Sequence, residues 1–290
     1  AVRAMAQGAR RRSFAEEIMA RLQRGAASLS YDARDRLRQR VEELRAPSGG
    51  FRGLDGQRDL YFSGFGFELA AVLNIPPRRE DIEQIETLRA VEDDGIHLLS
   101  VLRCRRALAC SPCTLPGTEA ALASWCHSAA ATTYGAFLIW LASDLAAAEP
   151  AHDAAGWPPM VETTAARPAR LATTLGAVLA TAWRLGDNAT AADCARRLAA
   201  LRHPAGGWRT AEDLAHADLL ATAVAAFALD VSGFRPSDGI ERDLEFVLAH
   251  RCADGGFAQR PGDGISDVES SWYALLALGS LRDERAEGVK

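Results

Sequence analysis

The residues of this chain with the clearest chemical potential are carboxylates next to apolar segments. Asp59, Asp218 and Asp267 each stand just before an apolar run, and Glu269 follows Asp267 by two positions. Such a carboxylate caps a helix by accepting its free N–H groups or, where it faces an apolar cavity, has a raised pKa suited to proton transfer. We expect all three aspartates to act as N-caps. Asp218, Asp267 and Glu269 are also the candidates for proton transfer.

Aromatic residues stand in the same segments as these carboxylates. Ring faces suit an isoprenoid or a carbocation, although such a stripe of rings is equally what a helical core contains. His216 lies two residues before Asp218, on a different face of any helix that includes both. The predicted ligand-binding residues are Tyr61, Phe65, Trp272, Tyr273 and His216.

Metal chemistry has one candidate segment. Cys110 and Cys113 form a C-x-x-C, and Cys126 and His127 follow it. A tetrahedral zinc site commonly uses two such pairs, whereas adjacent residues rarely reach one ion together. We therefore predict a loop with two thiols at residues 110–113, no metal site and no cofactor.

Helices must position these side chains, because apolar residues recur every three or four positions almost throughout the chain. Ser13 and Glu16 form a capping-box pattern at the first of them. No alternating run rich in Val and Ile has the length of a strand. We predict an all-α protein with twelve helices, at residues 13–24, 30–45, 58–74, 77–92, 96–109, 116–128, 132–148, 167–185, 189–202, 212–231, 239–250 and 268–281.

A repeat indicates how the helices are arranged. The pattern R-x-x-x-G-G-[FW] occurs at residues 45–51, 202–208 and 251–257, and a weaker copy ends at Trp157. Trp157, Trp208 and Phe257 are separated by 51 and 49 residues. The glycines allow positive φ where one helix ends, and the aromatic residue anchors the loop. A unit of this length is a helical hairpin that must stack on its neighbours, so twelve helices predict six hairpins.

The repeat resembles that of the protein prenyltransferase β-subunits and the squalene and terpenoid cyclases. The stretch DGGFAQRPGDGISD at 254–267 is similar to the G-G-F-x-x-R-P-G…D of the prenyltransferase β-subunits, and SGGFRG at 48–53 with the following Asp59 resembles another copy. The resemblance covers residues 45–74, 202–229 and 251–280. It implies an (α/α)6 toroid of helical hairpins around a central cavity.

The motifs that carry the chemistry of this family are missing. Its zinc site uses D-x-C and a later histidine. The D-x-C position reads Asp218-Leu-Leu220, or Asp267-Val-Glu269 if that repeat is the counterpart, and the histidine position reads Ser270. The cyclase motif D-x-D-D has its nearest match at residues 91–94, where the first position is Val91. The resemblance therefore implies the fold and an isoprenoid-type ligand without implying zinc-dependent prenyl transfer.

Composition excludes several classes of protein. The chain has 290 residues, is 48% hydrophobic, and carries a formal charge of −5, which argues against a nucleic-acid partner. Six cysteines are too few for a disulfide scaffold and indicate reduced thiols and a cytoplasmic protein. The longest segment without charged residues, 120–143, contains too much Ala, Ser and Thr to predict a transmembrane helix.

We expect an N-terminal helical extension at residues 1–44 and a toroid at residues 45–290. The leading hypothesis is a prenyltransferase-like or terpene cyclase-like protein that binds an apolar, isoprenoid-type molecule in its central cavity, with or without catalysis of prenyl transfer or cyclisation. The alternative is a non-catalytic binding or assembly module. A true prenyltransferase would in addition need a partner subunit and zinc.

Overall fold

The computed structural model describes residues 12–88, 94–110, 117–129, 133–146 and 171–282 and shows an all-α protein, as predicted. None of the described helices is both long and apolar enough to cross a membrane. The described residues form twelve helices: α1 (Phe14–Ala27), α2 (Tyr31–Glu43), α3 (Leu60–Val72), α4 (Arg79–Thr87), α5 (Gly95–Ala107), α6 (Thr118–Ala129), α7 (Thr133–Leu145), α9 (Ala172–Leu185), α10 (Asn188–Ala200), α11 (Leu219–Val231), α12 (Ile240–Leu248) and α13 (Val268–Leu281).

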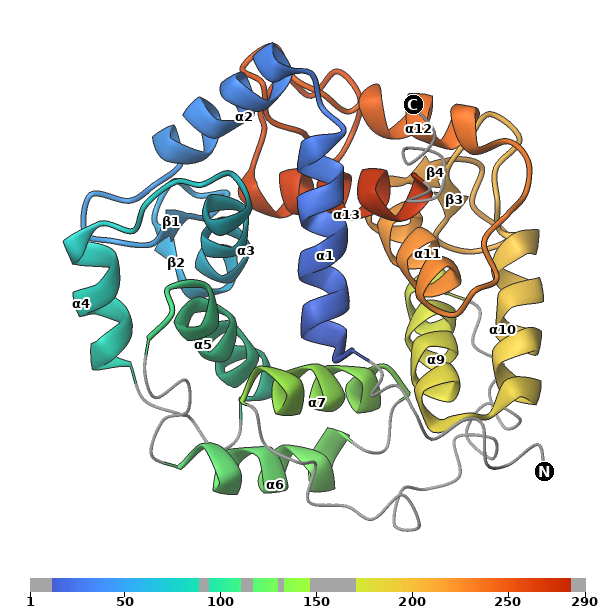
Figure 1. Ribbon diagram of the computed structural model, residues 1–290, viewed down its shortest axis with the longest axis horizontal. Coiled ribbons are helices and arrows are strands. Elements are labelled where there is room, and N and C mark those ends of the chain that lie inside the picture. Colours follow the sequence, from blue (N-terminus) through green and yellow to red (C-terminus); the bar gives the residue numbers. More distant parts are fainter. Residues whose placement is uncertain (1–11, 89–93, 111–116, 130–132, 147–170, 283–290) are drawn as a thin grey trace.

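Six of these helices contact one another in a closed cycle. In Figure 1, α3, α5, α7, α9, α11 and α13 follow one another around the molecule, each contacts the next, and α13 contacts α3. Outside them α2, α4, α6, α10 and α12 contact α3, α5, α7, α9 and α13 respectively. The sequences differ accordingly, because α11 is apolar all round and nearly all buried, whereas α2 buries only Ala33, Leu37 and Val41.

The glycines of the repeat bring each loop against an outer helix. Gly49, Gly206 and Gly255 have φ of 88°, 105° and 94°. A Cβ on them would lie 2.4 Å from the carbonyl oxygen of Glu80, 2.1 Å from that of Arg242 and 2.5 Å from the Cβ of Arg36, respectively. These contacts are with α4, α12 and α2, so the loop of the last repeat packs on the first outer helix in the same way as the others pack on theirs.

The aromatic residue of each repeat is anchored by a hydroxyl group. Phe51, Trp208 and Phe257 are fully buried, and their backbone N–H groups donate to the side-chain oxygens of residues in the following inner helix. The donor–acceptor distances are 2.9, 2.9 and 3.0 Å, and the acceptors are Ser63, Thr222 and Ser271. Because a buried N–H group without a partner is costly, the hydroxyl group belongs to the repeat as much as the glycines do.

The repeat arginine is paired in two of the three copies. Arg202 contacts Asp243 with Nη2 and Oδ2 2.5 Å apart, and Arg45 pairs in the same way with Asp81. Each aspartate also accepts the N–H of the second repeat glycine, at 2.9 Å in both copies. In the third copy the repeat glycine contacts Arg36 of α2, and the next residue is Leu37, where the other two copies have the pairing aspartate.

The predicted caps are confirmed, but one predicted boundary is wrong. Asp59, Asp218 and Asp267 accept the N–H groups of Phe62, Ala221 and Ser270 at 2.9, 2.8 and 2.7 Å. The helix expected from residue 212 begins only at Leu219, because a two-stranded hairpin precedes it. Strand β3 (Trp208–Arg209) pairs with β4 (Ala217–Asp218), as β1 (Phe51–Arg52) pairs with β2 (Arg58–Asp59), and the sequence predicted neither pair.

Helix α1 lies inside the cycle of helices, contacting α3, α7, α11 and α13 (Figure 1). Gly25 and Gly279 let α1 and α13 touch, because a Cβ on either would come within 2.0 Å of the other helix's backbone. Arg21 pairs with Asp230 of α11, Nε to Oδ2 at 3.0 Å. The prediction that twelve helices pair into six hairpins is therefore wrong as counted, since α1 belongs to no hairpin. The weak repeat at Trp157 lies outside the described residues.

Candidate functional site: the central cavity

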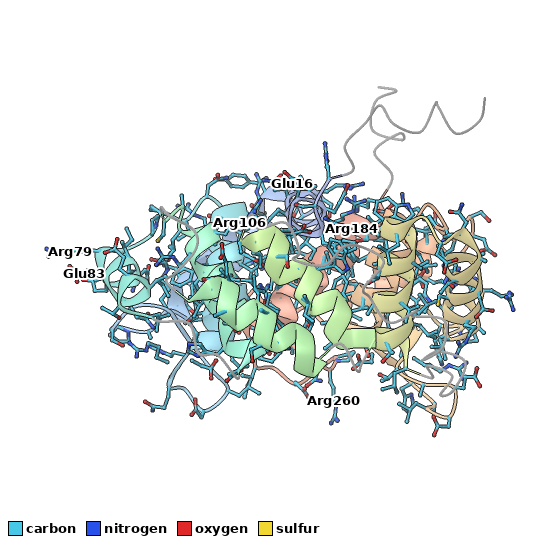
Figure 2. The ribbon with its side chains drawn as sticks, turned by 90° about the horizontal axis from the view of Figure 1, so that it is seen from below. Glu16, Arg79, Glu83, Arg106, Arg184 and Arg260 are labelled. Atoms are coloured by element: carbon cyan, nitrogen blue, oxygen red, sulfur yellow. The ribbon has the colours of Figure 1, made fainter. Side chains whose placement is uncertain are left out.

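A cavity of about 310 Å³ lies at the centre of the molecule, between α1 and the six inner helices. Every inner helix contributes residues to its wall. The side chains of Ala15, Ile18 and Met19 on α1 close one end. Figure 2 shows Glu16 of α1 on one face of the molecule, with Arg106 and Arg184, and Arg260 on the opposite face.

One half of the wall is apolar. Leu138 and Leu141 of α7 line it together with small residues of the neighbouring helix α9, where Gly176 packs so close to α11 that a Cβ would lie 2.6 Å from Val224. The remaining residues of this half are Phe137, Leu145, Thr173, Ala177, Ala180, Phe227 and Ala228. This surface offers a ligand apolar contact and few hydrogen-bonding groups.

The other half of the wall, on α3, α5 and α13, combines rings with a buried ion pair. Arg103 donates through Nε and Nη2 to Glu68, at 3.0 and 2.6 Å, and the indole N–H of Trp272 donates to Glu68 at 2.7 Å. The Arg103 guanidinium also lies over the ring of Phe65, 4.0 Å from its centroid. The side chains of the ion pair are only 8–10% exposed, so breaking it would leave an uncompensated charge in the core.

Tyr61 and Glu269 form an acid pair at the edge of the cavity. The Tyr61 hydroxyl donates to Oε1 of Glu269 at 2.6 Å, joining the first turns of α3 and α13. Burial raises the pKa of Glu269, the hydrogen bond from Tyr61 opposes that rise, and the nearby charge of Asp267 adds to it. Among the described residues this is the only hydrogen bond of the Glu269 side chain, so its second oxygen is available to a ligand.

The structure brings together most of the predicted site. Tyr61, Phe65, Trp272 and Tyr273 all line the cavity, and their rings contact in sequence at centroid distances of 5.0–5.3 Å. The Glu269 carboxylate joins them through Tyr61.

The other predicted site residues lie elsewhere or act as caps. Asp267 caps α13 and accepts the Ser270 hydroxyl at 2.8 Å, and burial raises its pKa while these hydrogen bonds lower it. Asp218 caps α11 outside the cavity wall, and His216 is exposed in the loop before β4.

Sequence reasoning missed Glu68 and Arg103. Each is the one charged residue within an otherwise apolar stretch, LYFSGFGFEL at 60–69 and LLSVLRC at 98–104. Glu68 is the one charge of α3, a helix otherwise apolar all round, and such a charge must find a buried partner. That signal was present in the sequence for Glu68 but not for Arg103, because α5 also carries Arg105 and Arg106.

Metal candidates are few in the described part of the chain, where no group of three or more His, Cys, Asp and Glu side chains is placed to hold an ion. The segment with Cys113 and the side chains of Cys126 and His127 lie outside the described residues. Asp94, at the end of the D-x-D-D-like segment, caps α5 by accepting the N–H of His97 at 2.8 Å.

No family model matches the chain, and no curated protein matches it either. We therefore infer the function from the cavity and its wall. The arrangement encloses an apolar volume and offers a ligand several ring faces, and the carboxyl group of Glu269 is hydrogen-bonded to Tyr61 of the wall. Such a site can hold an apolar molecule and exchange a proton with it.

Proposed function

We propose that the helices form an (α/α)6 toroid in which α2 is the first outer helix and only the residues before it form an extension. The closed cycle of inner-helix contacts supports this arrangement. The contact of Gly255 with Arg36 supports ring closure, because it repeats the contacts of Gly49 and Gly206 with α4 and α12.

We propose that the protein binds an apolar, isoprenoid-type small molecule in the central cavity. The observation that carries this proposal is the enclosed volume of about 310 Å³, walled by aliphatic residues on α7, α9 and α11 and by rings on α3 and α13. Small-molecule sites have volumes of roughly 300–1,000 Å³ and are mostly apolar with a few placed polar groups. A polyene chain matches such a wall by apolar contact, and a carbocation formed on it would be stabilised by ring faces.

Within this proposal Glu269 is the proton donor. Its carboxyl group would transfer a proton to a double bond of the bound molecule, the π electrons forming the new C–H bond and leaving a carbocation. The Tyr61 hydroxyl, 2.6 Å away, would stabilise the carboxylate that remains. Loss of a proton from a neighbouring carbon would then return Glu269 to its acid form, so the reaction is an isomerisation or cyclisation without net redox change.

A non-catalytic binding module is the second candidate. One observation favours it: Glu68, Arg103 and Trp272 satisfy one another, so the most buried polar groups of the wall have a structural role already. A binding protein needs only the cavity, whereas an enzyme also needs Glu269.

Binding and catalysis are tested separately. Geraniol and farnesol, titrated against the protein, should quench the tryptophan fluorescence, to which Trp272 on the wall contributes, and raise the unfolding temperature. Ala177→Phe, which fills the cavity, should abolish both effects, and Ala199→Phe on the exposed surface of α10 is the control. Binding that survives Ala177→Phe would contradict the proposal.

Product analysis by gas chromatography then decides between the two candidates. Glu269→Gln should bind the same compounds but form no product. Binding by the parent protein without any turnover favours the non-catalytic module.

A further inference from the structure

The cavity is closed at one end and accessible at the other. Helix α1 covers the end near the C-termini of the inner helices. At the opposite end the wall is formed by the first turns of α3, α5 and α9, where Tyr61 and Ile96 are 37% and 45% exposed. We call this end the mouth. A ligand with one polar end would place that end at the mouth, because α1 and the aliphatic wall offer it little polar contact.

The mouth is poorly suited to an anionic group. Helix N-termini attract phosphates through their free N–H groups, but on four inner helices an aspartate already accepts an N–H of the first turn and places a negative charge there. Of the described inner helices with a defined start, only α9, which begins after Leu171, lacks a side-chain cap. The capping residues are Asp59, Asp94, Asp218 and Asp267.

The arginines described on the cavity wall do not offset the negative charge of these carboxylates. Arg103 is the arginine on the wall nearest to the acid pair, and both of its donors described above point to Glu68. Arg106 lies at the other end of the cavity, on the face of α1, and Figure 2 shows Arg260 pointing away from the molecule. A diphosphate at the mouth would therefore face these carboxylates, and neither of the two described arginines on the cavity wall is placed to bind it there.

The acid pair offers what a cation requires. Oε2 of Glu269 has no hydrogen-bond partner among the described residues, and its Oε1 is held in place by Tyr61 at 2.6 Å. Tyr61 contacts this carboxylate, and the rings of Trp272 and Tyr273, one turn further along α13, line the cavity. The wall already shows that such rings accept a cation, since Arg103 lies 5.0 Å from the Trp272 ring centroid. An ammonium group at this place would gain a charge-assisted hydrogen bond and ring contacts together.

We propose that the central cavity takes an apolar molecule ending in a protonated amine, whose ammonium group binds Glu269 and Tyr61 while its apolar part packs on α7, α9 and α11. This inference rests on the proposed binding of an apolar molecule in the cavity and narrows the class of that ligand. It favours the non-catalytic form of the proposal, because a Glu269 carboxylate paired with an ammonium group has no proton to donate. It excludes isoprenoid diphosphates as the preferred ligands, although the resemblance of the repeat implies them.

Four compounds with one tail test the head group: farnesylamine, farnesol, farnesoic acid and farnesyl diphosphate, each titrated by calorimetry at pH 7. The amine should bind about tenfold more tightly than the alcohol, since a hydrogen bond to a charged group contributes about that factor. In Glu269→Gln this preference should disappear while the alcohol still binds, which also shows that the variant is folded. Asp218→Asn, a cap outside the cavity wall, should retain it.

The possible failures are distinguishable. If none of the four compounds binds, the proposed function and this inference both fail. If the tail binds but the diphosphate or the acid binds most tightly, or amine and alcohol bind equally, only the inference fails. A preference for the amine that persists in Glu269→Gln also overturns it, because the carboxylate would then not be the recognition group.

The pH dependence is a second readout. The groups that face Glu269 are Asp267 on its own element, Asp59 and Tyr61 at α3, and Arg103 on α5. Burial and the two aspartates raise its pKa, whereas Tyr61 and Arg103 lower it. The amine binds the carboxylate form, so its affinity should fall as the pH falls through this pKa, while that of farnesol should not.

Discussion

The contact between α1 and α13 gives the sharpest prediction for stability, because it depends on two glycines. Gly279→Ala places a Cβ 1.8 Å from the carbonyl oxygen of Arg21. Real Cβ contacts do not come below 3.0 Å, and the atom met is backbone, so no side-chain rotation relieves the clash. Helix α1 must therefore move at least 1.2 Å away from α13, which follows from the same two distances.

The cost in free energy of unfolding comes from the apolar contacts of α1 that this movement breaks. Ile18 and Leu22 of α1 are 6% and 0% exposed against the core. A gap of about 1 Å already forfeits up to half of the dispersion energy of such contacts. Overpacking of a core costs about 1–3 kcal/mol of stability. We expect about 3 kcal/mol here, because the clash is with a backbone atom that no side-chain rotation can move away. Replacing a helical glycine returns about 1 kcal/mol, so we expect a net loss of about 2 kcal/mol in the free energy of unfolding.

Urea unfolding followed by circular dichroism measures this loss. The matched control is Gly64→Ala, since Gly64 is also a buried helical glycine but a Cβ there would lie 3.5 Å from its nearest neighbour, an ordinary contact. The control should be neutral or stabilised by up to about 1 kcal/mol. If Gly279→Ala is as stable as Gly64→Ala, α1 does not lie against α13, and the closed end of the cavity is refuted with it.

Three further outcomes follow from the wall and the repeat. The pKa of Glu269 is raised in the folded protein, so the folded protein keeps this proton at a pH where the unfolded chain, with a pKa near 4.5, has lost it. The contribution of this proton to the free energy of unfolding is complete below pH 4.5 and is lost as the pH rises through the pKa of the folded protein. Glu269→Gln should therefore gain stability over the parent at pH 7 but not at pH 4 in urea unfolding, and an equal change at both would contradict this. Glu68→Leu should cost about 3–5 kcal/mol by leaving Arg103 unpaired, and adding Arg103→Met should recover much of it; additive losses in this double-mutant cycle would argue against coupling. Thr222→Val should cost about 1–3 kcal/mol because the N–H of Trp208 loses its acceptor, whereas Thr222→Ser should remain close to the parent protein.

Local features of the fold were readable from the sequence. Helices, caps and loops depend on neighbouring residues, so the periodicity placed all twelve helices and the aspartates placed three of their starts. The exception is instructive, because residues 212–218 were assigned to a helix although Asp218 was recognised as its cap. A hairpin of two-residue strands has too little sequence to show a period, and its pairing is decided by the loop that carries Trp208.

The candidate site was predicted in part for the same reason. The rings of Tyr61, Phe65, Trp272 and Tyr273 stand on apolar helices, and such helices must face one another in the interior. Their meeting around one cavity is a property of the closed cycle, which brings α13 against α3 across about 200 residues of chain. His216 could not be excluded from the site by spacing alone, because its exposure follows from the position of the β3–β4 loop.

The sequence by itself therefore determined the all-α class, the repeat and the capping chemistry, since each depends on interactions within about ten residues. Only the tertiary structure decided that α1 closes the cavity, that Glu68 pairs with Arg103 and that Glu269 meets Tyr61. These contacts join residues that are distant in the chain, and their geometry depends on how all the helices pack together. The carboxylates noticed first thus separate into caps, which are local, and one acid, Glu269, whose role depends on the fold.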